Sequence, residues 1–208
     1  MLLFATVSFG QQVTTIDLDN FWSAYDSLPN CANKSDSVNV FQVHYIDKAS
    51  DGFKAFLAAR SFTAEEYYLN VKAYPRFWES IRGNTMRVKT LKSEIDRIYA
   101  AYESAFPGHE APKICFAIGC LRTGGTVDDG YLLIGTEIAA ADASTDKSEL
   151  DSWLNSVMTE EFDIQNMIAH EYVHALQELK FSGVWGYLNY RVLMLSIYEG
   201  AADFIAEK

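Results

Sequence analysis

The sequence predicts an α+β fold that is mostly helical and contains a small sheet. Over residues 17–28 and from about residue 48 to residue 106, apolar residues recur at helical spacing. Residues 113–119 (KICFAIG) and 131–139 (YLLIGTEIA) are instead apolar and β-rich, which predicts two strands. Helical patterning returns from about residue 148 and continues to the end. Because no repeat, low-complexity tract or linker interrupts this order, residues 11–208 are predicted to form a single domain.

Composition narrows the class of protein. Of 208 residues, 49% are hydrophobic, which is too many for a disordered chain. The formal charge is 17 − 28 = −11, so binding to nucleic acid through phosphate contacts is not expected. Beyond the first residues, no apolar run approaches the roughly 20 residues of a membrane-spanning helix, so no transmembrane segment is expected.

Residues 1–10 (MLLFATVSFG) resemble the end of a secretory signal peptide that is cleaved after Gly10, with its basic start missing. The alternative is a short buried N-terminal strand. Export to the periplasm, the cell envelope or the extracellular space would place Cys31, Cys115 and Cys120 in an oxidising compartment. Cys115 and Cys120 are five residues apart and would point to opposite faces of a strand, so buried free thiols are favoured over a bridge.

The helical first half divides at turn residues. A helix is predicted over residues 17–28, and residues 37–46 are ambiguous between helix and strand. The helical text from about 48 to 106 is expected to break at Pro75 and at Gly83-Asn84. Thr63, followed by acidic residues, is a predicted N-cap.

In the second half, residues 122–126 (RTGGT) are predicted to be a loop between the two strands, and residues 148–157 a short helix. A long helix is predicted from about residue 160 to residue 179, with Thr159 as its N-cap. The last helix is expected to begin near Gly186 and to run almost to the end of the chain.

Residues 170–174 (HEYVH) carry the clearest chemical signal. His170 and His174 are four residues apart on a predicted helix, so both rings project from one face and can bind a single ion. Glu171 lies beside that face, where it can deprotonate a water. A chance occurrence is the competing explanation, and a zinc site also needs a third protein ligand.

Glu199 is the predicted third ligand. It follows an apolar stripe on the last helix, where a carboxylate is costly unless it is paired or bound to metal. The small residues 200–202 would let another helix approach closely, and Asp203 can accept a hydrogen bond from a ligand histidine. The alternatives are a surface carboxylate for Glu199 and a solvated one for Asp203. The stripe consists of Leu188, Val192, Leu195 and Ala202.

HEYVH at 170–174 followed by EGAAD at 199–203 resembles the gluzincin branch of zinc metallopeptidases. The resemblance implies a zincin-like fold, in which a small sheet packs on the HExxH helix and on the third-ligand helix. It also implies Zn²⁺ held by His170, His174 and Glu199. Glu171 would be the catalytic base, and Asp203 would lie behind a ligand histidine.

Residues 112–137, and Gln177 three positions after His174, resemble a bacterial family of predicted zinc-dependent proteases of uncharacterised function. Gliding-motility lipoproteins of Bacteroidetes are related to that family. The chain ends nine residues after Glu199, where zincins usually continue, so the domain is expected to be incomplete at its C-terminus. Zincins bind substrate along a sheet edge, and the strand at 131–139 is the expected edge; an internal core strand is the alternative.

The sequence therefore predicts an exported zinc metallopeptidase that acts on peptides or proteins, with Glu171 as general base. One alternative is a non-catalytic cell-envelope or motility-associated protein that keeps the zincin scaffold. Another is a zinc hydrolase that cuts a non-peptide bond. The remaining histidines, His44 and His109, lie outside any metal-ligand spacing and are expected to be structural.

Negative charge is concentrated in residues 128–163, which hold ten acids and one base, Lys147, for a charge of 1 − 10 = −9. Two interpretations remain open. The segment is either a solvated acidic surface or a means of attracting cationic peptides or a divalent ion.

Overall fold

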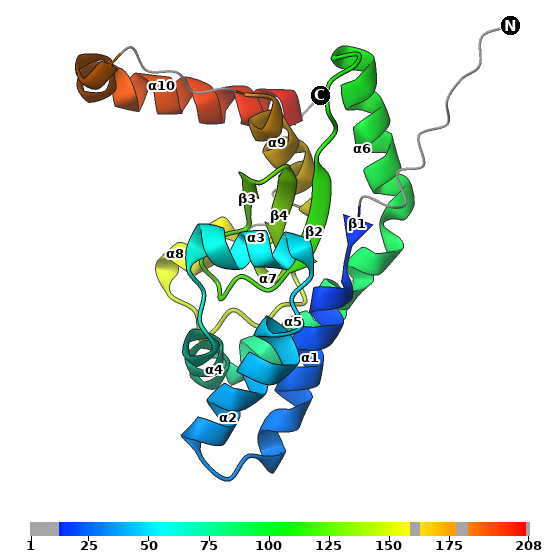
Figure 1. Cartoon of the computed structure of the whole chain (residues 1–208), viewed down its shortest axis with the longest axis vertical. Helices are drawn as coiled ribbons and strands as arrows, with labels where there is room; N and C mark the ends of the chain where they lie inside the picture. The colour runs from blue at the N-terminus through cyan, green and yellow to red at the C-terminus, as the bar shows by residue number, and fades with distance from the viewer. Residues whose placement is uncertain (1–12, 159–162, 178–182, 207–208) are drawn as a thin grey trace, which may run out of the picture.

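A computed structural model describes residues 13–158, 163–177 and 183–206, and within 183–189 it describes the backbone only. The signal-peptide prediction for residues 1–10 lies outside this part of the chain. Helices predominate and surround one small mixed sheet, which confirms the α+β class (Figure 1). The long C-terminal helix α10 (Gly183–Ala206) crosses the end of α9 (Ile164–Leu176) and extends away from the rest of the fold.

The first half of the chain is helical because its segments begin at polar caps. The side chains of Asn33, Ser50 and Thr63 each accept a hydrogen bond from the N–H three residues on, which confirms Thr63 as an N-cap. The elements are α1 (Ile16–Ser27), η2 (Leu28–Asn30), α2 (Lys34–Phe41), η3 (Gln42–Ile46), α3 (Asp51–Arg60), α4 (Ala64–Ala73), α5 (Pro75–Arg87), η4 (Val88–Thr90) and α6 (Lys92–Ala105).

The structure decides two uncertain boundaries in this half. The ambiguous segment 37–46 is helical, with its last turn widened to a π-helix. The predicted break at Gly83-Asn84 is wrong, because α5 continues through both residues to Arg87. Tertiary packing explains this: Asn84 and Thr85 are buried, and the Thr85 hydroxyl accepts a hydrogen bond from Trp22 Nε1 at 3.0 Å. This packing outweighs the weak helix preference of the Gly-Asn pair.

The sheet has the strand order β1-β2-β4-β3. β1 (Val13–Thr14), β2 (Lys113–Ala117) and β4 (Tyr131–Gly135) are parallel, and β3 (Gly125–Asp128) pairs antiparallel to β4.

Two predictions about this sheet are therefore wrong. Residues 131–139 are not the edge strand, since β4 lies between β2 and β3. The segment 122–126 is not entirely loop, because Gly125 begins β3, which lies at one edge of the sheet. Strand pairing is non-local, so the sequence of β4 alone did not reveal its neighbours.

Helices cover both faces of this sheet. α3 contacts β2 and β4 and crosses in front of them, while α9 contacts β3 and β4 from behind (Figure 1). The central strands are consequently buried along nearly their whole length, including Cys115. Cys115 and Cys120 are buried free thiols and Cys31 is a partly exposed one, which confirms the predicted lack of a bridge.

The helical half also holds the loop that follows β2. The hydroxyls of Tyr45 and Tyr67 both donate to the carbonyl of Ile118, at 3.1 and 2.8 Å. Cys120 and Leu121 then take left-handed backbone angles, with φ of 53° and 57°, which is uncommon for residues other than glycine. An aromatic core around Phe21 therefore supports a strained turn at the start of the segment that leads to β3.

Glu137 holds this turn from the other side. The strand prediction for residues 131–139 ends early, because residues 136–139 form the short helix α7 (Thr136–Ala139). The fully buried Glu137 carboxylate accepts hydrogen bonds from the N–H groups of Gly119, at 3.0 Å, and Leu121, at 2.7 Å. The pKa of Glu137 is raised to about 7, because the effect of burial exceeds the opposing effect of the N–H bonds.

We expect Glu137 to make the stability of the protein depend on pH. Its folded-state pKa lies above the ordinary value of 4.5, so its contribution is complete below about pH 4.5 and is lost as pH rises through about 7. Glu137→Gln should remove this dependence, which is on the order of 3 kcal/mol. Chemical denaturation at pH 5 and pH 8 measures it, with Glu110→Gln at an exposed position as the matched control. Equal pH dependence in wild type and Glu137→Gln would contradict the prediction.

Several other acids of the 128–163 segment stabilise helix starts. The segment is therefore neither wholly a solvated acidic surface nor wholly a means of attracting cations. Asp151 and Asp163 are the N-caps of α8 (Ser152–Val157) and α9. Glu149 accepts hydrogen bonds from the N–H groups of Arg76 and Phe77, at the start of α5. These carboxylates satisfy N–H groups at helix N-termini.

The boundaries of the last helices differ from those predicted. Thr159 and residue 160 lie outside the described residues, and α9 begins at Ile164 behind the Asp163 cap rather than at residue 160. α9 ends at Leu176, and Gln177 leaves it in an extended conformation, earlier than the predicted end at residue 179. α10 begins at Gly183 rather than near Gly186.

Candidate metal centre

His170 and His174 lie one turn apart on α9 and face the same point. Asp163 starts the helix by accepting hydrogen bonds from the N–H groups of Gln165 and Asn166. The buried apolar face of α9 then rests on the sheet and fixes which way the histidine rings project. The Nε2 atoms of the two rings are 2.9 Å apart, as expected from their four-residue spacing.

Glu199 reaches the same point from α10. Its Oε2 atom is 3.2 Å from His174 Nε2 and 3.4 Å from His170 Nε2. One ligand atom from each of the three residues lies within 4.8 Å of the others, so the group can hold a metal ion. The fully buried Ala202, one turn later, is consistent with the predicted close approach of α9 and α10.

Burial in an apolar stripe, which was the sequence argument for Glu199, is not seen in the structure. The apolar stripe before it was expected to be buried, yet Val192 is 79% exposed because that part of α10 extends beyond α9. The Glu199 side chain is itself 55% exposed. Its position opposite two imidazoles, rather than burial in an apolar stripe, makes it a metal-ligand candidate.

The other nitrogen of each histidine ring also has a partner. His170 Nδ1 is 2.9 Å from Oδ1 of Asp203, at ion-pair distance. His174 Nδ1 is 2.8 Å from Gln177 Oε1. Contacts through Nδ1 leave both Nε2 atoms directed at Glu199, and such outer partners set the orientation of metal-binding imidazoles.

Gln177 joins α9 to α10. While its Oε1 atom contacts His174, its Nε2 donates to the carbonyl of Tyr198 at 3.1 Å. The ring of Tyr198 stacks on the His174 imidazole, with centroids 4.2 Å apart and planes at 10°. In the sequence, Gln177 is marked only by a resemblance, and Tyr198 only by its position beside Glu199.

We expect Gln177→Ala to weaken binding of added Zn²⁺ at the candidate metal site about 10- to 100-fold, because the variant loses the contact to His174 and a link between α9 and α10. Competition with a chromophoric chelator would measure the zinc affinity. Gln165→Ala, at an exposed position of the same helix, is the matched control and should bind zinc like wild type. Unchanged affinity in Gln177→Ala would show that Gln177 does not position His174.

Glu171 lies against β3. Its side chain is 6% exposed, and a Cβ atom on Gly125 would lie only 2.6 Å from Glu171 Cγ, so a glycine is needed there. The pKa of Glu171 is raised to about 7, mainly by burial and also by the charge of Glu199, while the Arg60 guanidinium acts in the opposite direction. A carboxyl group with a pKa near neutrality is well suited to accept and return a proton.

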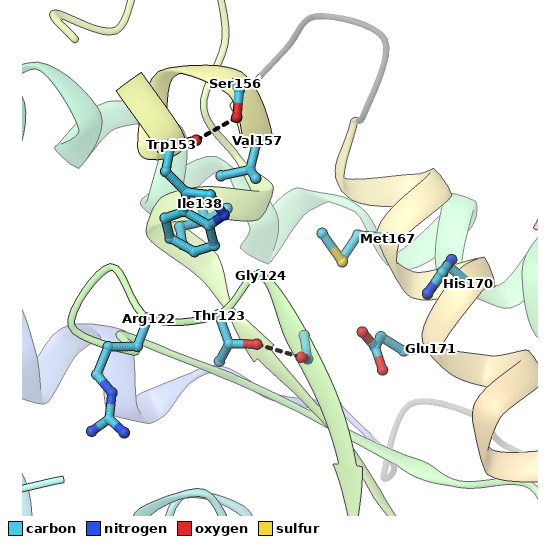
Figure 2. Close-up of a pocket in the computed structure, with 11 residues that line it drawn as sticks. Arg122, Thr123, Gly124, Ile138, Trp153, Ser156, Val157, Met167, His170 and Glu171 are labelled. Carbon is cyan, nitrogen blue, oxygen red and sulfur yellow. Dashed lines mark hydrogen bonds between the residues drawn. The ribbon is translucent and has the colours of Figure 1, made fainter. Parts of the chain in front are cut away.

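A cavity of about 370 Å³ opens beside His170 and Glu171 (Figure 2). It lies between the segment that leads into β3, helix α8 and helix α9. Its lining residues are Arg122, Thr123, Gly124, Gly125, Ile138, Trp153, Ser156, Val157, Met167, His170 and Glu171. One candidate metal ligand, His170, and the candidate base therefore border a space that can accept part of a substrate.

The donor set suits zinc. Two imidazoles with one carboxylate are a known ligand combination of catalytic zinc, and three protein ligands leave an open position. Imidazole also accepts copper, iron and nickel, so the residues alone do not select the metal. Of the remaining histidines, His109 contacts the Tyr172 hydroxyl at 2.6 Å, on the side of α9 that faces α6, and does not join the site.

Comparisons with known protein families, with characterised proteins and with solved structures find no match to this chain. Within the described residues, no helix is long and apolar enough to cross a membrane.

Proposed function

We propose that this protein is a zinc-dependent metallopeptidase of the gluzincin type, with a zincin-like fold. The observation that carries the proposal is the convergence of His170, His174 and Glu199 beside the buried carboxyl group of Glu171. A metal site with a purely structural role would not need a carboxyl group beside it that can act as a base. This carboxyl group favours the enzyme over a non-catalytic envelope protein.

Each residue has a role in the proposed reaction. Zinc at this donor set would supply a Lewis acid that polarises the scissile carbonyl and lowers the pKa of water. Glu171 accepts the proton of the attacking water and later donates it to the leaving amine. Asp203 and Gln177 hold the two imidazoles in orientation through their Nδ1 atoms.

β3 is the proposed binding edge for an extended substrate. It lies at one edge of the sheet, and its first residue, Gly125, lies against Glu171. A peptide that pairs with the outer side of β3 would gain main-chain hydrogen bonds and pass close to the candidate base. Export to the periplasm, cell envelope or exterior remains part of the proposal and rests on residues 1–10.

Metal analysis combined with a mixed peptide library tests the proposal. We expect about one zinc per chain, and cleavage that stops with a chelator and returns when zinc is added. If the full-length protein holds zinc but cuts no peptide, the peptidase proposal fails. A screen of ester and amide substrates would then separate a zinc hydrolase of another bond from a non-catalytic protein.

A further inference from the structure

Most of the exposed surface of the cavity beside Glu171 is apolar. Ile138 on α7, Trp153 and Val157 on α8 and Met167 on α9 provide its apolar surface. Figure 2 shows Met167 and Glu171 on the α9 side, with Ile138, Trp153 and Val157 grouped across the cavity from them. Gly124 lies between these groups, and a Cβ atom there would come within 2.5 Å of Met167 Cε. The backbone at Gly124 therefore packs directly on Met167 and closes that side of the cavity.

Three polar side chains of the lining, those of Arg122, Thr123 and Ser156, form an ion pair or hydrogen bonds with other protein groups. The Arg122 side chain points away from the cavity (Figure 2), and its guanidinium pairs with Glu66 at 3.0 Å. The Thr123 hydroxyl donates to the Gly125 carbonyl, and the Ser156 hydroxyl donates to the Trp153 carbonyl. Among the described lining residues, the ionisable groups that face the space are those of His170 and Glu171, at its catalytic side.

We propose that this cavity is the specificity pocket of the enzyme and that it binds a large uncharged apolar side chain, such as Leu, Met or Phe, next to the scissile bond. The inference rests on the proposed peptidase function. Apolar walls stabilise an apolar side chain in proportion to the area that it buries. A charged side chain would lose its hydration without gaining a partner among the described residues at the far end of the cavity. Half-exposed Trp153 offers a ring face that can pack on an aromatic side chain.

Cleavage specificity is the first test. In a peptide library, wild type should cut beside Leu, Met and Phe at least about tenfold faster than beside Asp or Lys at one fixed position. Val157→Phe should narrow the pocket and lower the rate for Phe relative to Ala by about tenfold or more, with zinc content unchanged. Val43→Phe, the same substitution at an exposed position outside the cavity lining, is the matched control and should keep the wild-type preference. Faster cleavage beside Lys, or an unchanged Phe-to-Ala ratio in Val157→Phe, would overturn the proposal.

Binding without turnover is the second test, and it separates failure of the pocket from failure of the peptidase function. Metal-free protein is titrated with the N-acetyl amides of Phe, Lys and Asp while tryptophan fluorescence is recorded. The Phe amide should change the emission at lower concentration than the other two, and Trp153→Phe should abolish most of the change. If no peptide is cut but this binding is seen, the function fails and the pocket stands. An equal response to all three amides overturns the pocket, whatever the cleavage result.

Discussion

Glu171→Gln should lose peptide hydrolysis by about 10²- to 10⁴-fold and still hold about one zinc per chain. The amide keeps the shape that fits against Gly125 but cannot accept a proton at neutral pH. Zinc retention is expected because the predicted ligands are His170, His174 and Glu199, and Glu171 is not among them. Single-turnover cleavage of one good library peptide, with zinc content determined on the same sample, measures both quantities.

The exposed Glu110→Gln is the control, and it should match wild type in both rate and zinc content. The same preparation of Glu171→Gln also reveals any contaminating protease, because such activity would persist. If Glu171→Gln cuts as fast as wild type while the activity remains sensitive to chelators, Glu171 is not the general base. The chemistry would then have to be assigned to another group.

His170→Ala and Glu199→Ala should each lower zinc affinity by more than the roughly 10- to 100-fold expected when an outer partner is lost. Each substitution removes one of three donor atoms that lie within 4.8 Å of one another. Loss of a donor leaves two ligands, which is too few for a site that also keeps an open position. Zinc stoichiometry after dialysis, followed by chelator competition, would measure the effect.

His44→Ala is the matched control for His170→Ala, because His44 lies in η3 and lies outside the candidate metal group. Circular dichroism on each variant shows whether the fold is intact before zinc is measured. Full zinc stoichiometry and wild-type affinity in a folded His170→Ala would place the metal somewhere else. If only Glu199→Ala retained wild-type affinity, the two histidines would stand as ligands and the third would have to be sought elsewhere.

Features that depend on neighbours along one helix could be predicted from the sequence. The four-residue spacing of His170 and His174 projects both rings to one side in any α-helix, and the structure brings their Nε2 atoms to 2.9 Å. The N-cap at Thr63 and the helical character of most of the first half follow from equally local chemistry. Asp203 lies one turn after Glu199 for the same local reason, and its Oδ1 atom is 2.9 Å from His170 Nδ1.

Features that depend on which distant segments pack together could not be predicted. Strand order decides that β3, not β4, is the edge, because hydrogen-bonded neighbours come from separate parts of the chain. Burial decides that Glu137 holds a turn inside the protein, although it belongs to an acidic segment that suggested a solvated surface. The bridge from Gln177 to Tyr198 exists only because α10 crosses α9 there.

The sequence alone therefore determined the class of fold, the two-histidine face with its adjacent glutamate, and the acidic residues that could complete a metal site. The tertiary structure decided the edge strand beside Glu171, the side chains that orient each imidazole, and the apolar cavity next to them. The physical reason is the range of the interactions. Helix spacing and capping act within one or two turns, whereas strand pairing, burial and cavity shape depend on contacts between residues far apart in the chain.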